Sequence, residues 1–193
     1  MRVHFQSAIS AAAVTLVLGV GTAYATAAGA VAAPPTAAGQ PSVWQHRQAR
    51  FTYSAFTTAY SCDGIEDKVA RILKFFGARA AKVQAIGCVP GPNTPTHMIL
   101  IDVQFDTLAA AGGDQPEAQI VQAQWTSVQL DARRPFFMDE GDCELIDSLK
   151  PVLTANFSFQ DLSYATACTP HQLSLEDFRV NGKVLKPLQG HAG

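Results

Sequence analysis

The sequence predicts an α+β fold in which tandem β-α-β-β repeats form a ferredoxin-like antiparallel sheet with two helices on one face, or a duplicated variant with a longer sheet. Two observations support this prediction. Cysteines recur as a helix-start and strand-end pair, Cys62 with Cys88 and Cys143 with Cys168, at nearly equal separations. Each pair encloses an apolar helical pattern followed by a strand pattern. Two such units can bury their apolar faces by placing both helices on one side of a sheet.

The N-terminal segment has the pattern of an export signal. Arg2 precedes an apolar run over residues 8–20, and Ala23-Tyr24-Ala25 follows as a small-residue cleavage pattern. The run is shorter than the roughly 20 residues that span a bilayer. We therefore expect a signal peptide over residues 1–25, and a periplasmic or secreted protein that has no membrane span after cleavage. Residues 26–48 begin with Ala, Gly, Pro and Thr, a composition that predicts a disordered leader.

The first unit is expected to contain a strand, a helix and two further strands. Aromatic and β-branched residues over 50–60 predict the first strand. Ser61 is a candidate N-cap for the helix that follows. Residues 82–88 predict a short second strand, and the clearest alternation in the sequence, over 99–106, predicts the third. The helix presents one apolar face, formed by Ile65, Val69, Ile72, Leu73 and Phe76.

The second unit repeats this order. Residues 120–130 and 157–166 predict strands on either side of a helix that Asp142 is placed to cap. Pro151 is expected to kink or shorten that helix. Asn181-Gly182 predicts a β-hairpin, because this dipeptide suits the positive φ angles of a type I′ turn.

These patterns predict one domain over residues 49–187. It consists of a unit over about 50–107 and a second over about 120–187, and residues 188–193 are expected to form a flexible tail. The length is typical of a single domain with its own core.

Export favours disulfides, because oxidising compartments preserve them. Four cysteines allow three pairings. The repeat favours Cys62–Cys88 and Cys143–Cys168, since each unit then has its own equivalent bond. Closing each loop is expected to stabilise the fold by roughly 3–4 kcal/mol in the chain-entropy model.

Residues 57–88 resemble a heavy-metal-associated domain, a ferredoxin-like family that binds soft metals through Cys-x-x-Cys at the start of its first helix. The resemblance implies a metal site that begins at Cys62. Ile65 replaces the second cysteine of that motif, and Ile146 replaces it in the second unit. One thiolate is a poor site for a soft metal. We therefore predict no metal and no cofactor, and keep soft-metal handling as a third hypothesis.

Charge limits the classes of partner. The sequence has 14 Lys and Arg against 16 Asp and Glu, so it lacks the concentrated basic field that nucleic acid requires. The two units differ in charge, which favours attraction between their helices within one molecule, with head-to-tail association as the alternative if the helices are not neighbours. Bases surround the first helix and acids begin the second: Lys68, Arg71, Lys74, Arg79 and Lys82 against the acids from Asp139 to Asp147.

Three residues are candidates for acid–base catalysis. Asp102 and Asp106 share one side of the alternating strand, and His97 precedes it. Such groups can move protons in hydrolysis. No nucleophile elbow, H-E-x-x-H or phosphate-loop motif accompanies them. We therefore place a hydrolase-type enzyme second to a non-catalytic binding or interaction protein.

The segment Pro135-Phe136-Phe137-Met138 is an apolar loop before the second helix. A loop of this kind either packs under the core as a hydrophobic staple or forms an exposed contact patch. Phe136, Phe137 and Met138 are therefore candidates for a surface that contacts an unknown protein or small ligand.

Overall fold

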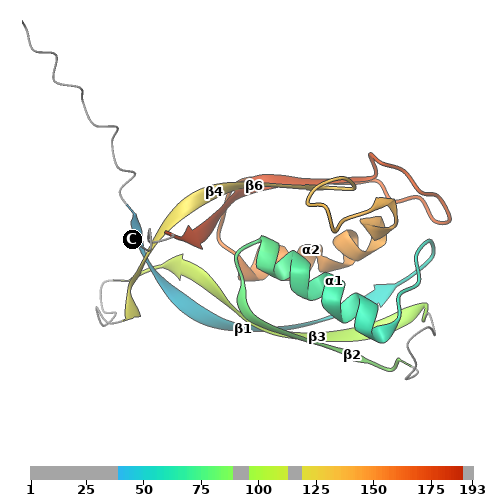
Figure 1. Ribbon diagram of the computed structural model, residues 1–193, viewed down its shortest axis with the longest axis horizontal. Helices are drawn as coiled ribbons and strands as arrows, with labels where there is room; N and C mark the ends of the chain where they lie inside the picture. Colours follow the sequence, from blue (N-terminus) through green and yellow to red (C-terminus); the bar gives the residue numbers. More distant parts are fainter. Residues whose placement is uncertain (1–38, 89–95, 113–118, 189–193) are drawn as a thin grey trace, which may run out of the picture. The chain divides into compact units, whose positions relative to one another are not determined.

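A computed structural model describes residues 39–88, 96–112 and 119–188 of the protein (Figure 1). The predicted signal peptide, most of the predicted leader and nearly all of the predicted tail lie outside these residues. In chain order the elements are β1 (Gln40–Ser54), α1 (Cys62–Phe75), β2 (Arg79–Ile86), β3 (Met98–Ala110), β4 (Val121–Asp131), the 3-10 turn η2 (Glu140–Asp142), α2 (Cys143–Asn156), β5 (Phe159–Thr166) and β6 (Phe178–Pro187).

The six strands form one sheet in the order β2-β3-β1-β4-β6-β5, and all neighbouring strands are antiparallel. β1 pairs with β3 from Ser42 to Ser54, but it pairs with β4 only through Gln40, Pro41 and Ser42. The sheet therefore divides into two three-stranded halves that are joined at this short junction. Figure 1 shows both helices between the two halves. In each half the helix follows the first strand, and the strand after the helix lies at the sheet edge.

The prediction of a ferredoxin-like sheet with two helices on one face is wrong. Strands dominate the fold, and the two helices have only 14 residues each. The physical reason lies in the lengths of the strands. β1 begins at Gln40, within the segment expected to be leader, and β3 continues to Ala110. The additional residues carry β1 to its junction with β4, so the two halves become parts of one longer antiparallel sheet.

Two local predictions are wrong: the Asn181-Gly182 hairpin and the Asp142 cap, because the Asp142 side chain makes no capping hydrogen bond to α2. Asn181-Gly182 forms no hairpin, because β6 passes straight through it and Gly182 pairs with Val128 of β4. A side chain at Gly182 would lie 3.3 Å from the carbonyl oxygen of Gln160, so the glycine allows the neighbouring strand to approach closely. Pro151 does not end α2, which continues to Asn156. Leucine and valine side chains on both sides of the proline are buried and hold the helix in place.

The core forms where both helices pack against the sheet. The predicted face of α1 is confirmed: Ile65, Val69, Ile72, Leu73 and Phe76 are all completely buried. Ser61 caps the helix, because its hydroxyl accepts a hydrogen bond of 3.2 Å from the Gly64 N–H.

Aromatic side chains connect the two halves inside this core. Phe105 of β3 stacks on Phe157, with ring centroids 5.5 Å apart, and Phe76 meets Phe157 edge to face. A second, smaller cluster lies at the junction of β1 and β4, where Trp125 donates a 2.8 Å hydrogen bond to the Gln40 side chain. Residues of both halves therefore contribute to each of the two apolar clusters.

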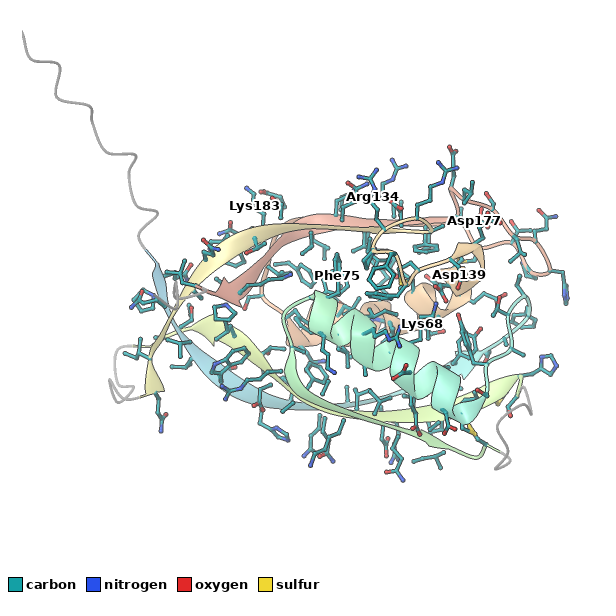
Figure 2. The ribbon with its side chains drawn as sticks, viewed as in Figure 1. Lys68, Phe75, Arg134, Asp139, Asp177 and Lys183 are labelled. Atoms are coloured by element: carbon teal, nitrogen blue, oxygen red, sulfur yellow. A yellow bond between two sulfur atoms is a disulfide. The ribbon has the colours of Figure 1, made fainter. Side chains whose placement is uncertain are left out.

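A buried ion pair joins α1 to the start of α2. Asp142 is completely buried and accepts hydrogen bonds from Lys68 Nζ at 2.8 Å, from the Tyr60 hydroxyl and from the Asp139 N–H. Lys68 also donates to the Phe137 carbonyl at 2.8 Å and to Asp139 Oδ2 at 3.1 Å (Figure 2). The attraction predicted between the basic and acidic helices is thus present at Lys68. Burial and the carboxylate of Asp142 raise the pKa of Tyr60 far above its usual range, so its hydroxyl stays protonated and donates.

Replacing Lys68 with methionine tests the importance of this ion pair. The variant leaves the Asp142 carboxylate buried without its cation, so we expect the free energy of unfolding to fall by about 3–5 kcal/mol. Lys74→Met is the matched control, because Lys74 is exposed on the same helix and should cost less than about 1 kcal/mol. Urea denaturation followed by circular dichroism measures both. Equal losses in the two variants would contradict a special role for Lys68.

Candidate functional site

Both disulfides are present, with the pairing that the repeat favours. Cys62, the first residue of α1, bonds to Cys88 just beyond β2, with Cα atoms 5.8 Å apart. Cys143 begins α2 and bonds to Cys168 beyond β5, with Cα atoms 5.6 Å apart. All four cysteines are oxidised, which is compatible with an exported protein. Among the described residues no helix is both long and apolar enough to cross a bilayer.

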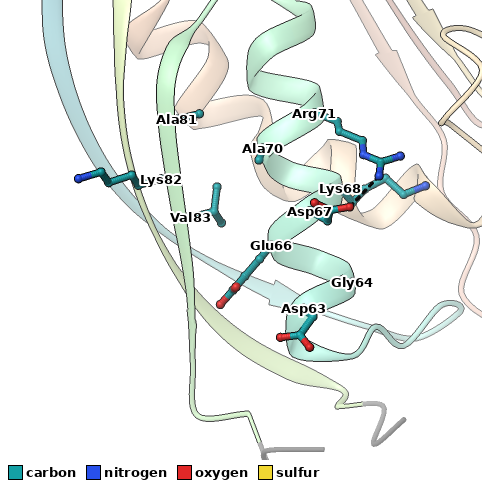
Figure 3. A pocket seen from close by; sticks show the side chains of 10 residues that line it. All are labelled: Asp63, Gly64, Glu66, Asp67, Lys68, Ala70, Arg71, Ala81, Lys82 and Val83. Atoms are coloured by element: carbon teal, nitrogen blue, oxygen red, sulfur yellow. Dashed lines mark hydrogen bonds and ion pairs between the residues drawn. The ribbon is translucent and has the colours of Figure 1, made fainter. Parts of the chain in front are cut away.

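A groove of about 780 Å³ lies between α1 and β2, the outermost strand of the first half (Figure 3). The first disulfide links the start of one wall to the far end of the other, because Cys62 belongs to α1 and Cys88 follows β2. The groove is therefore covalently closed near the N-terminus of α1. Its lining residues are Asp63, Gly64, Glu66, Asp67, Lys68, Ala70 and Arg71 from α1, and Ala81, Lys82 and Val83 from β2.

The two halves have equivalent edges, which allows the groove to be compared with its counterpart. Cys62 and Cys143 each begin a helix, and Ala80 and Asp161 each take positive φ, at +50° and +53°, where the edge strand bulges. A bulge of this kind bends an edge strand and limits pairing with other chains.

Counting from these landmarks shows why the hollow at the equivalent edge of the second half is smaller, about 240 Å³. The groove wall carries Ala70, Ala81 and Val83. The equivalent positions in the second half carry Pro151, Leu162 and Tyr164, and all three are larger.

The side chain of Tyr164 occupies the space between α2 and β5. Its hydroxyl donates a hydrogen bond to the Ile146 carbonyl, and the ammonium group of Lys150 lies 4.6 Å from the centre of its ring. Burial raises the pKa of the Tyr164 hydroxyl above its usual range, so this hydrogen bond persists at high pH. Small side chains thus leave a large groove at the α1–β2 edge, whereas Tyr164 leaves only a hollow of about 240 Å³ at the α2–β5 edge.

The open edge of β2 presents backbone groups to the groove. The Ala85 N–H donates a 2.7 Å hydrogen bond to Glu66 Oε1, so this amide points away from β3 and toward α1. Alternate residues of a strand direct their backbone groups to the same side. Val83 therefore also presents its N–H and C=O to the groove. Glu66 satisfies one edge donor with a side-chain acceptor in place of a neighbouring strand.

Acidic side chains dominate the end of the groove nearest the disulfide. Figure 3 shows Asp63 and Glu66 directed toward β2, whereas Lys82 extends away from α1. Asp67 is paired with Arg71 on the helix surface at 2.7 Å. Lys68 also lines the groove, but its ammonium group is held by Asp142 at 2.8 Å. Asp63 and Glu66 therefore give this end of the groove a negative field.

The predicted acid–base residues do not form a common site. Asp102 accepts a two-point hydrogen bond from Arg50, which lowers the pKa of its carboxyl. Asp106 accepts from His46 and Arg79, each at 3.1 Å, and these contacts also lower its pKa. The two carboxylates lie four residues apart on β3, about 13 Å along a strand.

His97 contacts a backbone carbonyl, and no hydrogen bond among the described residues joins it to Asp102 or Asp106. Its Nδ1 lies 3.3 Å from the carbonyl oxygen of Ala55. Carboxylates with lowered pKa values and basic partners are poor proton donors near neutral pH. The arrangement of Asp102 and Asp106 is that of a solvent-exposed ion-pair ladder.

The candidate contact loop is only partly exposed. Phe136 is 92% exposed, whereas Met138 is only 5% exposed. Phe137 meets Phe75 of α1 edge to face, with ring centroids 6.5 Å apart. Met138 also lines a shallow hollow of about 390 Å³ with Leu173 and Leu175, which are both exposed. The loop thus divides into one exposed tip and two packed residues. In the described part of the chain, no group of three or more His, Cys, Asp or Glu is arranged to hold a metal ion.

Comparison with protein-family models, with curated proteins and with solved structures finds no match.

Sequence reasoning did not identify the α1–β2 groove. Ala70, Ala81 and Val83 are ordinary small residues in an apolar pattern, and nothing in their own neighbourhood marks them. The available signal was the comparison of the two units, in which Leu162 and Tyr164 stand where Ala81 and Val83 stand in the first.

The two disulfides are expected to have separable effects. Replacing either cysteine pair with alanine should lower the free energy of unfolding by about 2–5 kcal/mol. Only Cys62→Ala/Cys88→Ala removes the link between the groove walls, so only this variant should accelerate hydrogen exchange at Ala85, whose amide is bonded to Glu66 across the groove. Cys143→Ala/Cys168→Ala is the matched control.

Hydrogen exchange followed by mass spectrometry measures the local effect, and non-reducing peptide mapping verifies the pairing. A Cys62–Cys143 or Cys88–Cys168 cross-link would contradict the structure. Equal acceleration at Ala85 in both double variants would show that the first disulfide does not hold the groove.

Proposed function

We propose that the protein is an exported, non-catalytic binding protein whose ligand lies in the α1–β2 groove. The observation that carries this proposal is the difference between the two edges. At the second edge Tyr164 leaves only a hollow of about 240 Å³, whereas small residues keep a groove of about 780 Å³ open in the first. A groove of about 780 Å³ is within the size range of ligand sites.

Covalent connections at both ends fix the separation of the two groove walls, which supports a binding role. The Cys62–Cys88 disulfide fixes one end. At the other end α1 turns directly into β2 through Gly77, which takes φ +98°. A site that is already rigid loses little conformational entropy when a ligand binds.

The other functions are less well supported. A hydrolase that uses Asp102, Asp106 and His97 would need these groups around one reacting atom, and each has a separate partner. Soft-metal handling would need thiolates, but Cys62 and Cys143 are in disulfides. The exposed Phe136 remains a candidate for a second contact point.

Filling the groove should abolish binding. Val83→Tyr copies Tyr164 at the equivalent position, and its ring should occupy the space between α1 and β2. Ala70→Leu narrows the groove from the helix side and serves as an independent second variant. Gln84→Tyr is the matched control, because Gln84 is exposed on the opposite face of the same strand.

The measurement is enrichment of a displayed library of random twelve-residue peptides on the immobilised, oxidised protein. We expect recovery to fall at least about tenfold for both groove variants and to stay unchanged for Gln84→Tyr, a difference of about 1.4 kcal/mol. Thermal unfolding of each variant verifies that it folds. Wild-type recovery by folded Val83→Tyr protein, or no enrichment by the wild-type protein, would contradict the proposal.

A further inference from the structure

We propose that the ligand is an extended basic peptide that pairs with β2 as a seventh strand of the sheet and displaces Glu66 from the Ala85 amide. This inference rests on the proposed function, because it names the class of ligand that the α1–β2 groove binds. Three features of the groove carry it: the direction of the edge amides, the limits on the length of the edge, and the charge at one end.

The edge amides are directed where a new strand would lie. Ala85 donates to Glu66 Oε1 at 2.7 Å, which fixes the orientation of this N–H away from β3. Val83, two residues earlier, presents a donor and an acceptor on the same side. A peptide lying alongside can exchange backbone hydrogen bonds with Val83 and supply a carbonyl to Ala85. Main-chain pairing of this kind provides affinity in strand-addition complexes.

The carboxylate of Glu66 acts as a removable cap on this edge. Glu66 is half-buried, lies on α1 and reaches across the groove to the strand. At the equivalent position of the second half, Asp147 accepts a 2.9 Å hydrogen bond from the Thr166 side chain rather than from a backbone amide. In the first half, therefore, a side-chain carboxylate covers a backbone N–H that could pair with an incoming strand. In the second half, the equivalent carboxylate is bonded to a hydroxyl group. A peptide carbonyl can replace the Glu66 carboxylate without leaving the amide unsatisfied.

The length of the open edge favours a short peptide over a second copy of the protein. The bulge at Ala80 interrupts the pairing of β2 with β3 between Arg79 and Lys82, so regular edge geometry is confined to residues 82–86. Five residues of strand span about 17 Å. A bulged, short edge beside a helix disfavours the extended sheet-to-sheet pairing that joins whole domains. A peptide segment fits this restricted edge.

The charge of the peptide follows from the acidic end of the groove. Asp63 is exposed, and displaced Glu66 would also lack its hydrogen bond to the strand. Lysine or arginine side chains of the peptide can pair with both carboxylates, whereas acidic side chains would be repelled. The small side chains Ala70, Ala81 and Val83 leave room for an apolar or small residue at the centre of the segment.

The test uses synthetic peptides with the oxidised wild-type protein. The parent peptide is acetyl-Thr-Lys-Thr-Val-Thr-Lys-Thr-amide, whose symmetric pattern presents lysine in either strand direction. A second peptide has glutamate in place of both lysines. Two further derivatives of the parent are N-methylated, one at its second, fourth and sixth residues and the other at its third and fifth. Calorimetry at about 50 mM salt measures affinity, because exposed charge pairs are screened at higher salt.

We expect the parent to bind about tenfold more tightly than the glutamate peptide. A strand pairs through alternate amides on one side, so only one of the two N-methylated derivatives should lose binding. Hydrogen exchange at Val83 and Ala85 should slow when the parent binds. Glu66→Gln keeps a side-chain acceptor but removes its charge, so it should reduce the preference for lysine while leaving that slowing in place.

The outcomes separate this inference from the proposed function. Equal binding of both charged peptides, loss or survival of binding in both N-methylated derivatives, or no parent binding up to about 1 mM would overturn the strand inference. Continued enrichment of library peptides by the wild-type protein and not by Val83→Tyr would then leave the proposed function standing. Enrichment that survives in Val83→Tyr would overturn the proposed function instead.

Discussion

The structure depends on one buried interaction, the contact of Lys68 with Asp142. Asp142 has no solvent exposure, so its charge requires the ammonium group 2.8 Å away. This contact fixes the rotation of α1 about its axis as well as its position. Residues two apart on a helix lie about 200° apart around it. With Lys68 held against the second half, Glu66 must lie on the opposite flank, which faces β2. The ion pair in the centre of the molecule therefore sets the acidic wall of the groove.

Sequence reasoning succeeded where the determinants are local. The capping hydroxyl of Ser61 and the apolar face of α1 depend only on neighbouring residues, and the disulfide pairing followed from equal spacing. Sequence reasoning failed where pairing with distant strands determines the local structure. Residues 40–48 look polar and unstructured in isolation, yet they form strand because β3 extends far enough to pair with them. Asn181-Gly182 has strong turn propensity, but pairing on both sides of β6 outweighs it.

The candidate site was harder to predict than the fold, because small side chains at a few positions define it. Charged residues such as Asp102 attract attention in a sequence, and in the structure Arg50 neutralises this carboxylate on an exposed strand face. Val83 gives no such signal in the sequence, because a valine in an alternating pattern fits any half-buried strand. Its significance appears only when the equivalent Tyr164 is seen to fill the same space. An internal repeat thus supplies a reference within one chain, in which differences between equivalent positions indicate what each half does.

The two halves therefore differ in how their edge strands, β2 and β5, are covered. In the second half, Tyr164 and Lys150 cover the edge of β5, and Asp147 is bonded to a side-chain hydroxyl. That edge keeps only a hollow of about 240 Å³. In the first half, the equivalent edge keeps its amides at Val83 and Ala85 within reach of the groove, under a single displaceable carboxylate. An unprotected edge of this type would promote aggregation, and the bulge at Ala80 together with Glu66 restricts access to it. Selective access to a short edge is the property that a peptide-binding surface requires.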